Sequence, residues 1–182
     1  MKHSGTQRLE TERLILRRFV IEDSDAMYEN WASDEEVTRY LTWPTHASRE
    51  ISEQVIQEWV NSYADESSYH WAIVLKDTGK AIGSMSVVLM NEDVSMMQVG
   101  YCVGRAWWGI GITSEALKAV MDYLFDVVDV NRIEAKHDPR NPNSGRVMRK
   151  CGMKYEGTLR GSARNNQGIC DASYYALLKS ER

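Results

Sequence analysis

Apolar residues recur at helical spacing in several segments of the chain. Between residues 113 and 128 they repeat at intervals of three and four, which predicts a helix with one buried face. This apolar stripe consists of Leu117, Val120, Met121, Leu124 and Val128. The same spacing predicts helices at residues 34–40 and 50–64, and the acidic residues 21–25 favour the start of another helix.

Short apolar runs predict the strands of a sheet. Residues 70–75 and 81–90 are joined by a segment with Asp77 and Gly79, residue types that favour a hairpin turn, and residues 96–103 supply the next strand. These three strands are expected to form an antiparallel meander. Further strands are expected at residues 13–19, 132–135, 154–159 and 172–178. A helix is expected at residues 143–151, and Gly152 terminates it.

The middle of the chain is predicted to run from strand to helix to strand. Because such a connection joins parallel neighbours, the sheet should contain a parallel pair among antiparallel strands, and the fold class is α/β of the mixed, α+β kind. The chain of 182 residues is within the usual size of one domain. We expect residues 1–8 to form a flexible tail and residues 9–182 to form a single domain.

Composition excludes several classes of protein. The chain is 43% hydrophobic and 26% charged, as globular proteins are. Its three cysteines form no CxxC pair and its histidines do not fall at metal-ligand spacing, so we expect neither a disulfide framework nor a metal. We find no signal peptide and no apolar run near the roughly 20 residues of a membrane span, and we therefore expect a cytoplasmic protein without membrane contact.

Charge is unevenly distributed along the chain. The net charge of −4 disfavours direct nucleic-acid binding. Residues 21–66 contain 12 acidic and two basic residues, whereas residues 140–164 contain seven basic residues and one acidic residue. An anionic ligand would favour the basic segment and a cationic ligand the acidic one, although both segments are equally well explained as solvated surfaces.

Two glycines one residue apart precede the predicted helix at residue 113. Gly109 and Gly111 allow backbone N–H groups to turn inward, and the helix N-terminus adds its partial positive charge, so the loop can cradle a pyrophosphate. Taken alone, the bare G-x-G pattern favours a plain strand-to-helix turn over a phosphate site. It is not the dinucleotide fingerprint, which requires a third glycine and a later acidic residue.

Four ordered motifs extend this pattern. GYCVGRAWWGIGITSEAL at residues 100–117 resembles the acetyl-CoA motif of the GNAT superfamily, in the form found in RimJ/RimL-type N-acetyltransferases. LETERLILR (9–17), NPNS (141–144) and KCGMKYEG (150–157) are similar to three further segments of that family. The resemblance covers roughly residues 9–178. It implies a mostly antiparallel sheet of about six to seven strands, with helices on both faces and a splayed parallel pair in the centre.

The resemblance also implies where acetyl-CoA binds. Family members lay its pantetheine arm between the two splayed strands, here those that end at Val103 and His137, with Asn141 hydrogen-bonded to the arm. A backbone N–H near Val103 would then stabilise the oxyanion of the reacting thioester. The pyrophosphate would bind backbone amides of Gly109, Ile110, Gly111, Ile112 and Thr113, and Trp108 is also expected to contact the coenzyme. The phosphates could also lie near the basic residues Arg146, Arg149 and Lys150.

The implied chemistry is direct transfer of the acetyl group to an amine. Ser144 is expected to approach the sulfur, because a thiol with a pKa of about 8.5 departs more readily when a hydroxyl donates to it. Without the other motifs, Asn141 and Ser144 would be interpreted as helix caps. Cys102 has no neighbouring histidine in the sequence, so we interpret it as structural.

The general base departs from the family pattern. The family often has Glu two residues before the Gly-Tyr pair, but this chain has Gln98, which cannot accept the proton. Glu134 is our candidate base and Glu92 an alternative, although such residues more often form solvated salt bridges. A water chain is the other route for the proton.

The acceptor is not specified by these motifs. RimJ/RimL-type enzymes acetylate N-terminal amines of ribosomal proteins, while relatives modify small amines such as polyamines, amino acids or drugs. The acidic segment would attract a cationic amine or a basic protein N-terminus. A non-catalytic acetyl-CoA-binding module remains a rival interpretation, and a homodimer is an expectation from the family alone. Candidates for lining the acceptor cleft are Trp31, Tyr40, Trp43 and Trp71.

Overall fold

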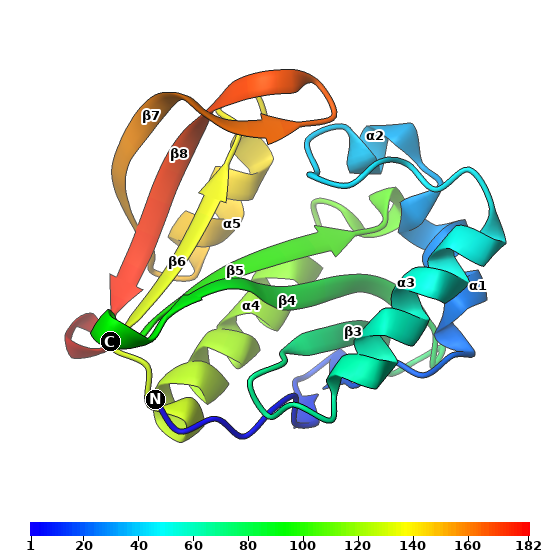
Figure 1. Cartoon of the computed structure of the whole chain (residues 1–182), viewed down its shortest axis with the longest axis horizontal. Coiled ribbons are helices and arrows are strands. Elements are labelled where there is room, and N and C mark those ends of the chain that lie inside the picture. The colour runs from blue at the N-terminus through cyan, green and yellow to red at the C-terminus, as the bar shows by residue number, and fades with distance from the viewer.

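The computed structural model describes all 182 residues, and its strands form one eight-stranded sheet. The strands lie in the order β1-β2-β3-β4-β5-β6-β8-β7, and all neighbours are antiparallel except the parallel pair β5 and β6 (Figure 1). The mixed α/β fold expected from the sequence is confirmed. In chain order the strands are β1 (Leu9–Glu10), β2 (Leu14–Arg17), β3 (His70–Leu75), β4 (Ala81–Asn91), β5 (Met96–Val103), β6 (Arg132–His137), β7 (Lys154–Asn165) and β8 (Gly168–Leu178).

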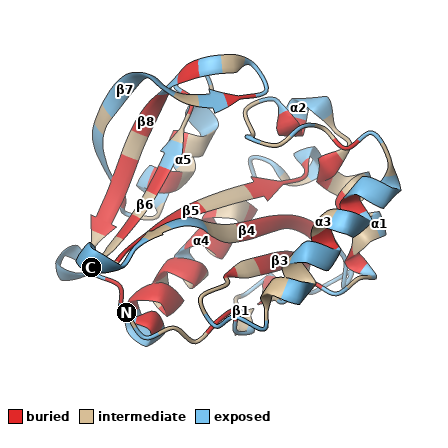
Figure 2. Cartoon of the chain, in the orientation of Figure 1, coloured by how far each residue is buried: buried red, intermediate tan, exposed pale blue.

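Helices cover both faces of the sheet. The α-helices are α1 (Asp23–Met27), α2 (Glu35–Thr38), α3 (Arg49–Ser62), α4 (Ile112–Tyr123) and α5 (Pro142–Lys150). Side chains of β3 alternate between two cores: Trp71 and Ile73 pack in the core with α4, while Ala72 and Val74 pack in the core with α1 and α3. The central strands and the inner face of α4 are accordingly buried (Figure 2). Each helix is too short or too polar to cross a lipid bilayer.

The strongest periodic segments are found where the sequence predicts them. The strands expected at residues 70–75 and 96–103 are β3 and β5. The predicted helix at residues 113–128 is α4, followed by a π-helical turn at Leu124–Val128. All five residues of its apolar stripe are buried. Hydrophobic periodicity therefore identified the elements that form the core.

Two differences concern the edges of the sheet. The sheet has one strand more than the six to seven expected, because β1 is only two residues long and too short to give a periodic signal. The last two strands are longer than predicted, since β7 extends to Asn165 and β8 begins at Gly168. Most of β7 is exposed, so its sequence lacks the apolar alternation of a half-buried strand.

Residues 1–8, for which we expected a flexible tail, lie against the body of the domain. The Lys2 amide donates to the Val128 carbonyl at 2.7 Å, and the Tyr123 hydroxyl donates to the Gly5 carbonyl at 2.7 Å. Thr6 is only 2% exposed. Met1 also packs against the core with α4. The two hydrogen bonds each span more than 110 positions, so no local pattern in the sequence reveals them.

Candidate functional site

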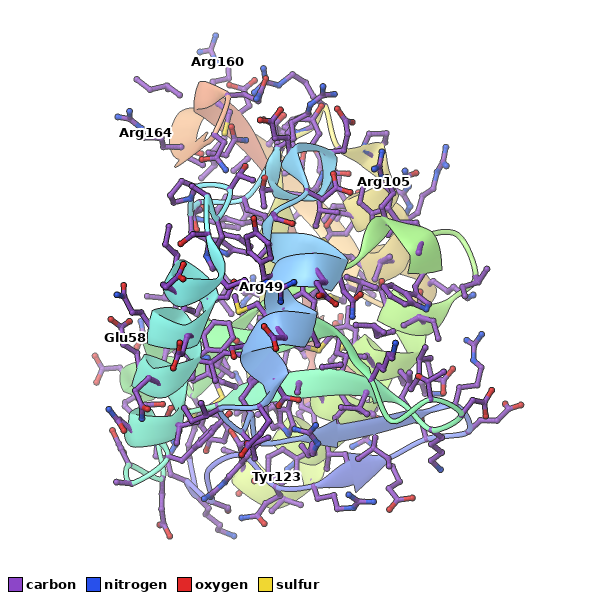
Figure 3. All side chains as sticks on the ribbon, turned by 90° about the vertical axis from the view of Figure 1, so that its right-hand side faces the viewer. Arg49, Glu58, Arg105, Tyr123, Arg160 and Arg164 are labelled. Atoms are coloured by element: carbon purple, nitrogen blue, oxygen red, sulfur yellow. The ribbon has the colours of Figure 1, made fainter.

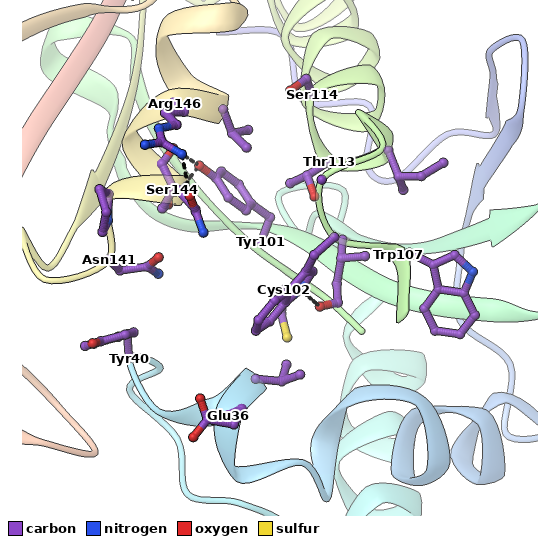
Figure 4. A pocket seen from close by; sticks show the side chains of 18 of the residues that line it. Glu36, Tyr40, Tyr101, Cys102, Trp107, Thr113, Ser114, Asn141, Ser144 and Arg146 are labelled. Carbon is purple, nitrogen blue, oxygen red and sulfur yellow. Dashed lines mark hydrogen bonds between the residues drawn. The ribbon is translucent and has the colours of Figure 1, made fainter. Parts of the chain in front are cut away.

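The parallel strands β5 and β6 separate into a V. Their Cα pairing ends at Gln98 and Glu134, although β5 continues to Val103 and β6 to His137. A cleft with a volume of about 550 Å³ lies next to the open end of the V. It is lined by residues of α2, β5, α5 and the loop that leads into α4, as the close view in Figure 4 shows. The splay implied by the family resemblance is therefore present.

The loop before α4, residues 108–113, has the geometry of an anion-binding site, and we call it the cradle. Gly109 and Gly111 have φ angles of +78° and +86°, a region that favours glycine. Gly111 precedes the helix without a side-chain cap, and the Glu115 amide donates to the Gly111 carbonyl at 3.0 Å. The amides of residues 112–114 therefore have no partner within the helix. These donors and the positive end of the helix dipole favour a bound phosphate.

A salt bridge fixes this loop from outside the cleft. The Glu115 carboxylate accepts hydrogen bonds from the Thr11 hydroxyl at 2.5 Å and from Arg13 Nε at 2.8 Å. Although burial opposes the effect, these bonds lower the pKa of Glu115. Arg13 Nη1 also donates to the Ile110 carbonyl at 2.9 Å. Ile110, predicted with its neighbours to bind the coenzyme, is the one loop residue from 108 to 113 that does not line the cleft.

Cationic side chains outnumber acidic ones on the walls of the cleft. Lys150 approaches the cradle, since its Nζ would lie 3.5 Å from a Cβ atom built on Gly111. Arg149, which the sequence grouped with it, points elsewhere and donates to the Tyr175 hydroxyl at 2.7 Å. The charged residues that line the cleft are Arg39, Arg140, Arg146, Lys150 and Glu36. The cleft thus suits an anionic ligand.

Asn141 and Ser144 both line the cleft beside the start of α5. Asn141 is the residue before the helix, yet its side chain makes no capping hydrogen bond, so the capping interpretation does not account for it. Ser144 Oγ lies 3.0 Å from the hydroxyl of Tyr101 on β5, and the same hydroxyl donates to the Ser144 carbonyl at 3.1 Å (Figure 4). Burial raises the pKa of Tyr101, so its phenol remains protonated.

Val103 directs its backbone polar groups into the open side of β5. The next residue, Gly104, donates its amide to the Ile82 carbonyl of β4 at 2.9 Å. Because backbone groups of successive strand residues point to opposite sides, the Val103 amide faces away from β4. Its carbonyl accepts a hydrogen bond from Trp108 Nε1 at 2.7 Å. The Val103 carbonyl is therefore occupied, and the Val103 N–H is left to face the gap between the strands.

Glu134 lies at the closed end of the V rather than in the cleft lining. Its neighbours Ile133 and Ala135 point into the core with α4, so its own side chain lies on the opposite face of the sheet. The carboxylate accepts a hydrogen bond from Arg132 Nε at 2.8 Å, and its other oxygen lies 3.5 Å from Gln98 Nε2. The salt bridge considered as the alternative role of Glu134 is thus present, with Arg132 as the partner.

Two other residues considered in the sequence are engaged elsewhere. Glu92, the alternative base, is hydrogen-bonded to His3 Nε2 at 2.7 Å on an exposed surface outside the cleft. Cys102 lines the cleft but is 7% exposed, and burial raises the pKa of its thiol. A protonated thiol is a poor nucleophile, which agrees with a structural role for Cys102.

The aromatic residues proposed for the acceptor cleft have different locations. Tyr40 lines the cleft, close to Asn141 in the view of Figure 4. Trp31 and Trp71 are completely buried in the two cores, and Trp43 packs outside the lining. Core packing therefore explains these tryptophans, and Tyr40 alone remains a candidate for contact with the acceptor.

The turn of the β7–β8 hairpin is fastened to the loop after α2. The Asn166 amide donates to the Leu41 carbonyl at 3.1 Å. Its side-chain Nδ2 donates to the carbonyls of Thr38 and Trp43, each at 2.8 Å. These three bonds join two segments far apart in the sequence and bring the hairpin turn next to α2 (Figure 1). Tyr40 and Leu41 in the same loop line the cleft, so the hairpin supports this wall.

Arginines pair with five of the 12 acidic residues in the acidic segment. Arg49 lies among the acidic helices and forms ion pairs with Asp25 at 2.5 Å and Glu29 at 2.6 Å (Figure 3). Further pairs join Arg17 to Asp23, Arg39 to Glu36 and Arg105 to Asp34. Of the acidic residues in this segment, Glu36 alone lines the cleft. The charge count therefore overstated how strongly this segment would attract a cationic amine.

Sequence reasoning did not assign a role to two residues of the cleft. Tyr101 stands in the motif that carries the family resemblance, and its spacing of two from Val103 on one strand could have placed both on the same side. Arg140 follows β6, where its guanidinium binds the buried Asp138 carboxylate at 2.6 Å and lies 6.0 Å from the Tyr40 ring. No local pattern in the sequence signals that arrangement.

Comparisons with known proteins agree with this geometry. The model of the acetyltransferase (GNAT) domain matches residues 13–154. An N-acetyltransferase p20 of Bacillus licheniformis is 32% identical over 95% of this chain and 97% of its own length. The [ribosomal protein uS5]-alanine N-acetyltransferase of Escherichia coli is 26% identical over 82% of this chain and 79% of its own length.

A solved structure shares the fold as well. The RimL ribosomal L7/L12 α-N-protein acetyltransferase in complex with coenzyme A superposes with a TM-score of 0.84 at 20% identity, covering 94% of this chain and 98% of that one. The family match spans most of the chain, including the cradle, the splayed strands and the start of α5. The chain therefore belongs to the GNAT acetyltransferase family and is an acetyl-CoA-dependent N-acetyltransferase.

Proposed function

We propose that this enzyme transfers the acetyl group directly from acetyl-CoA to a primary amine, the N-terminal α-amine of a ribosomal protein. The observation that carries the proposal is the convergence of three features on one cleft. The amides of residues 109–113, the N–H of Val103 and the hydroxyl of Ser144 all belong to segments that line it. Acetyl-CoA supplies the activated acyl group.

The donor would be held mainly by backbone groups. The loop amides and the N-terminus of α4 bind the pyrophosphate, with Lys150 and Arg146 adding positive charge. The free side chain of Asn141 hydrogen-bonds the pantetheine arm between the separated strands. Backbone donors fixed by secondary structure need no rearrangement during the reaction, which favours catalysis by preorganisation.

Three groups would act on the reacting atoms. The neutral amine attacks the thioester carbon, the C–S bond breaks, the nitrogen loses one proton and the sulfur gains one. The Val103 N–H stabilises the developing oxyanion and the Ser144 hydroxyl donates a hydrogen bond to the departing sulfur. We assign the role of general base to Glu134, which receives the proton through water because its carboxylate lies at the closed end of the V.

An α-amine suits this arrangement as the acceptor. Its pKa of about 7.7–8.0 leaves an appreciable neutral fraction near pH 7, whereas a lysine amine at about 10.4 requires a strong base. The position at which the family often has Glu is Gln98 here, so the site is better matched to an amine that needs little help. The Escherichia coli relative acts on the alanine of ribosomal protein uS5, an acceptor of this class.

A small amine is the second candidate, favoured by the fastening of the hairpin to α2. The hydrogen bonds of Asn166 to Thr38, Leu41 and Trp43 hold the hairpin turn against the wall that carries Tyr40. A wall supported in this way would restrict a bulky acceptor more than a small one. An extended protein N-terminus remains compatible with such an entrance.

A panel of acceptors tests the proposal. Release of coenzyme A thiol would be measured with acetyl-CoA and, in parallel, with N-terminal peptides of ribosomal proteins, the same peptides acetylated at the N-terminus, polyamines and amino acids. We expect thiol release with free N-terminal peptides and none with the blocked ones. Turnover with small amines alone would contradict the ribosomal acceptor, and mass spectrometry of ribosomal proteins from cells lacking the gene would decide the matter in vivo.

A further inference from the structure

We propose that Tyr101 is a positioning residue that orients the hydroxyl of Ser144 toward the departing sulfur. This inference rests on the proposed role of Ser144. It gives a role to Tyr101, a residue that the proposed function does not use. Both side chains line the cleft, and their hydroxyl oxygens lie 3.0 Å apart (Figure 4). Tyr101 comes from β5 and Ser144 from the first turn of α5, so the contact joins one strand of the V to the helix that follows the other strand.

The hydroxyl of Tyr101 has two acceptors within reach on the same residue. Its oxygen lies 3.1 Å from the Ser144 carbonyl and 3.0 Å from Ser144 Oγ. If Tyr101 donates to the carbonyl, the Ser144 hydroxyl can donate its proton to the phenol oxygen, and this proton then does not point into the cleft. If Tyr101 donates to Oγ, the serine proton is free for a ligand in the cleft. The direction of one proton therefore decides whether Ser144 can act as a donor.

Charge on the sulfur selects the second arrangement. Hydrogen bonds to a charged acceptor are roughly twice as strong as neutral ones, so a developing thiolate attracts the Ser144 proton into the cleft. The Ser144 oxygen then accepts a hydrogen bond from Tyr101. This bond makes the Ser144 hydroxyl a stronger donor, because neighbouring hydrogen bonds polarise one another. Tyr101 keeps its own proton throughout, since its buried phenol is a poor acid. It acts through Ser144 and donates no proton to the substrate.

The same strand carries both contacts to the reacting group. Tyr101 and Val103 are two residues apart on β5, so their side chains share one face and their amides point to the same side. A shift of the strand would move the oxyanion donor and the support of Ser144 together. This linkage gives a physical reason for a tyrosine at position 101, where a phenylalanine would fill the same space without the hydroxyl.

A double-mutant cycle tests the inference. We would measure kcat and the KM for acetyl-CoA in Y101F, S144A and the double variant. The matched control is Y123F, because the Tyr123 hydroxyl binds the Gly5 carbonyl outside the cleft. We expect Y101F to lower kcat by about threefold to tenfold, as for loss of one hydrogen bond, with unchanged KM. In the S144A background Y101F should cause no further loss, and Y123F should keep the wild-type kcat.

A conservative variant and a second readout separate positioning from folding. S144T keeps a hydroxyl, so Y101F should again lower kcat in that background. The rate at which iodoacetamide alkylates the thiol of enzyme-bound coenzyme A, measured against pH, should shift to higher pH in both Y101F and S144A. Thermal melts followed by circular dichroism would verify that each variant is folded.

The outcomes are distinguishable. Full activity of Y101F beside an impaired S144A would overturn the inference and leave the proposed function intact. An equal loss from Y101F with and without the Ser144 hydroxyl would show that Tyr101 acts independently, which also overturns it. Full activity of S144A would contradict the proposed role of Ser144 itself, and with it the role of Tyr101.

Discussion

Gln98 and Glu134 face each other in the last residue pair before the parallel strands separate, with Gln98 Nε2 3.5 Å from the Glu134 carboxylate. The other carboxylate oxygen is bound by Arg132 Nε at 2.8 Å. A carboxylate supplied by β6 therefore stands at the vertex of the V, and β5 carries an amide at the paired position.

Replacing Glu134 by Gln tests whether this carboxylate is the base. We expect kcat to fall about a hundredfold, as for loss of a general base, while the KM for acetyl-CoA is unchanged. Glu156 is a matched control because it also pairs with Arg132, at 2.5 Å, from β7. E156Q should retain activity, and equal effects of the two substitutions would show that Arg132, rather than the base, had been disturbed.

Gly111→Ala tests the cradle. The change forces a residue with a side chain to a φ of +86° and places a methyl group beside the loop amides, where Arg13 and Lys150 are the nearest neighbours. Such a residue costs about 1–2 kcal/mol in the left-handed region, so stability should fall. We also expect the KM for acetyl-CoA to rise about tenfold, through displacement of one or more phosphate hydrogen bonds.

Gly79→Ala separates these two effects. Gly79 has a φ of +66° in the β3–β4 turn and no atom within 4 Å of an added Cβ. It should lower the melting temperature much as Gly111→Ala does while leaving the KM for acetyl-CoA unchanged. A parallel rise of KM in both variants would indicate that strain, not the cradle, controls binding.

Lys150→Met tests the electrostatic part of coenzyme binding. Lys150 lines the cleft beside Gly111, so removing its charge should raise the Kd for coenzyme A by about threefold to tenfold at low salt. The difference should shrink at 1 M salt, where charges are screened within about 3 Å. Lys154→Met is the control, because Lys154 binds Glu181 at 2.6 Å outside the cleft. Calorimetry at two salt concentrations would detect a failure of either expectation.

Stability should decrease in mild acid because of His70. Burial lowers the pKa of His70 to about 4, and its ring lies against Trp59 and Ser86. An unfolded histidine has a pKa of about 6.5, so between these values the unfolded state binds a proton that the folded state does not. The contribution of His70 to the free energy of unfolding should therefore be fully present well above pH 6.5 and fall by about 3 kcal/mol by pH 4.

Urea unfolding of His70→Gln checks the assignment. Without a titrating ring at position 70, most of the decline between pH 6.5 and pH 4 should disappear. His3→Gln, at a partly buried site beside Glu92, should retain the decline. A decline that survives His70→Gln would assign the effect to another group.

Much of the fold could be predicted because its core elements carry strong periodic signals. The stripe from Leu117 to Val128 identified α4, and the apolar run from Met96 to Val103 identified β5. The loop between them could be recognised because Gly109 and Gly111 have positive φ angles, which few residues other than glycine adopt. These signals are local, so one sequence suffices to read them.

Long-range polar contacts could not be predicted in the same way. The hydroxyls of Tyr101 and Ser144 are 43 positions apart and meet only because the fold brings α5, which packs against β6 and α4, next to β5. The bonds of Asn166 to the loop after α2 span more than 120 positions. The charge of residues 21–66 suggested a cation site because counting within a segment ignores arginines from outside it, such as Arg17, which pairs with Asp23, and Arg105, which pairs with Asp34. Such partners become visible only once the chain is folded.

The most direct test is a crystal structure of the enzyme with acetyl-CoA. We predict that the pyrophosphate accepts hydrogen bonds from the amides of residues 109–113, with the thioester between β5 and β6, its carbonyl oxygen on the Val103 amide and its sulfur within hydrogen-bond distance of Ser144 Oγ. A coenzyme bound away from the loop before α4, or an acyl group that points out of the V, would contradict the account.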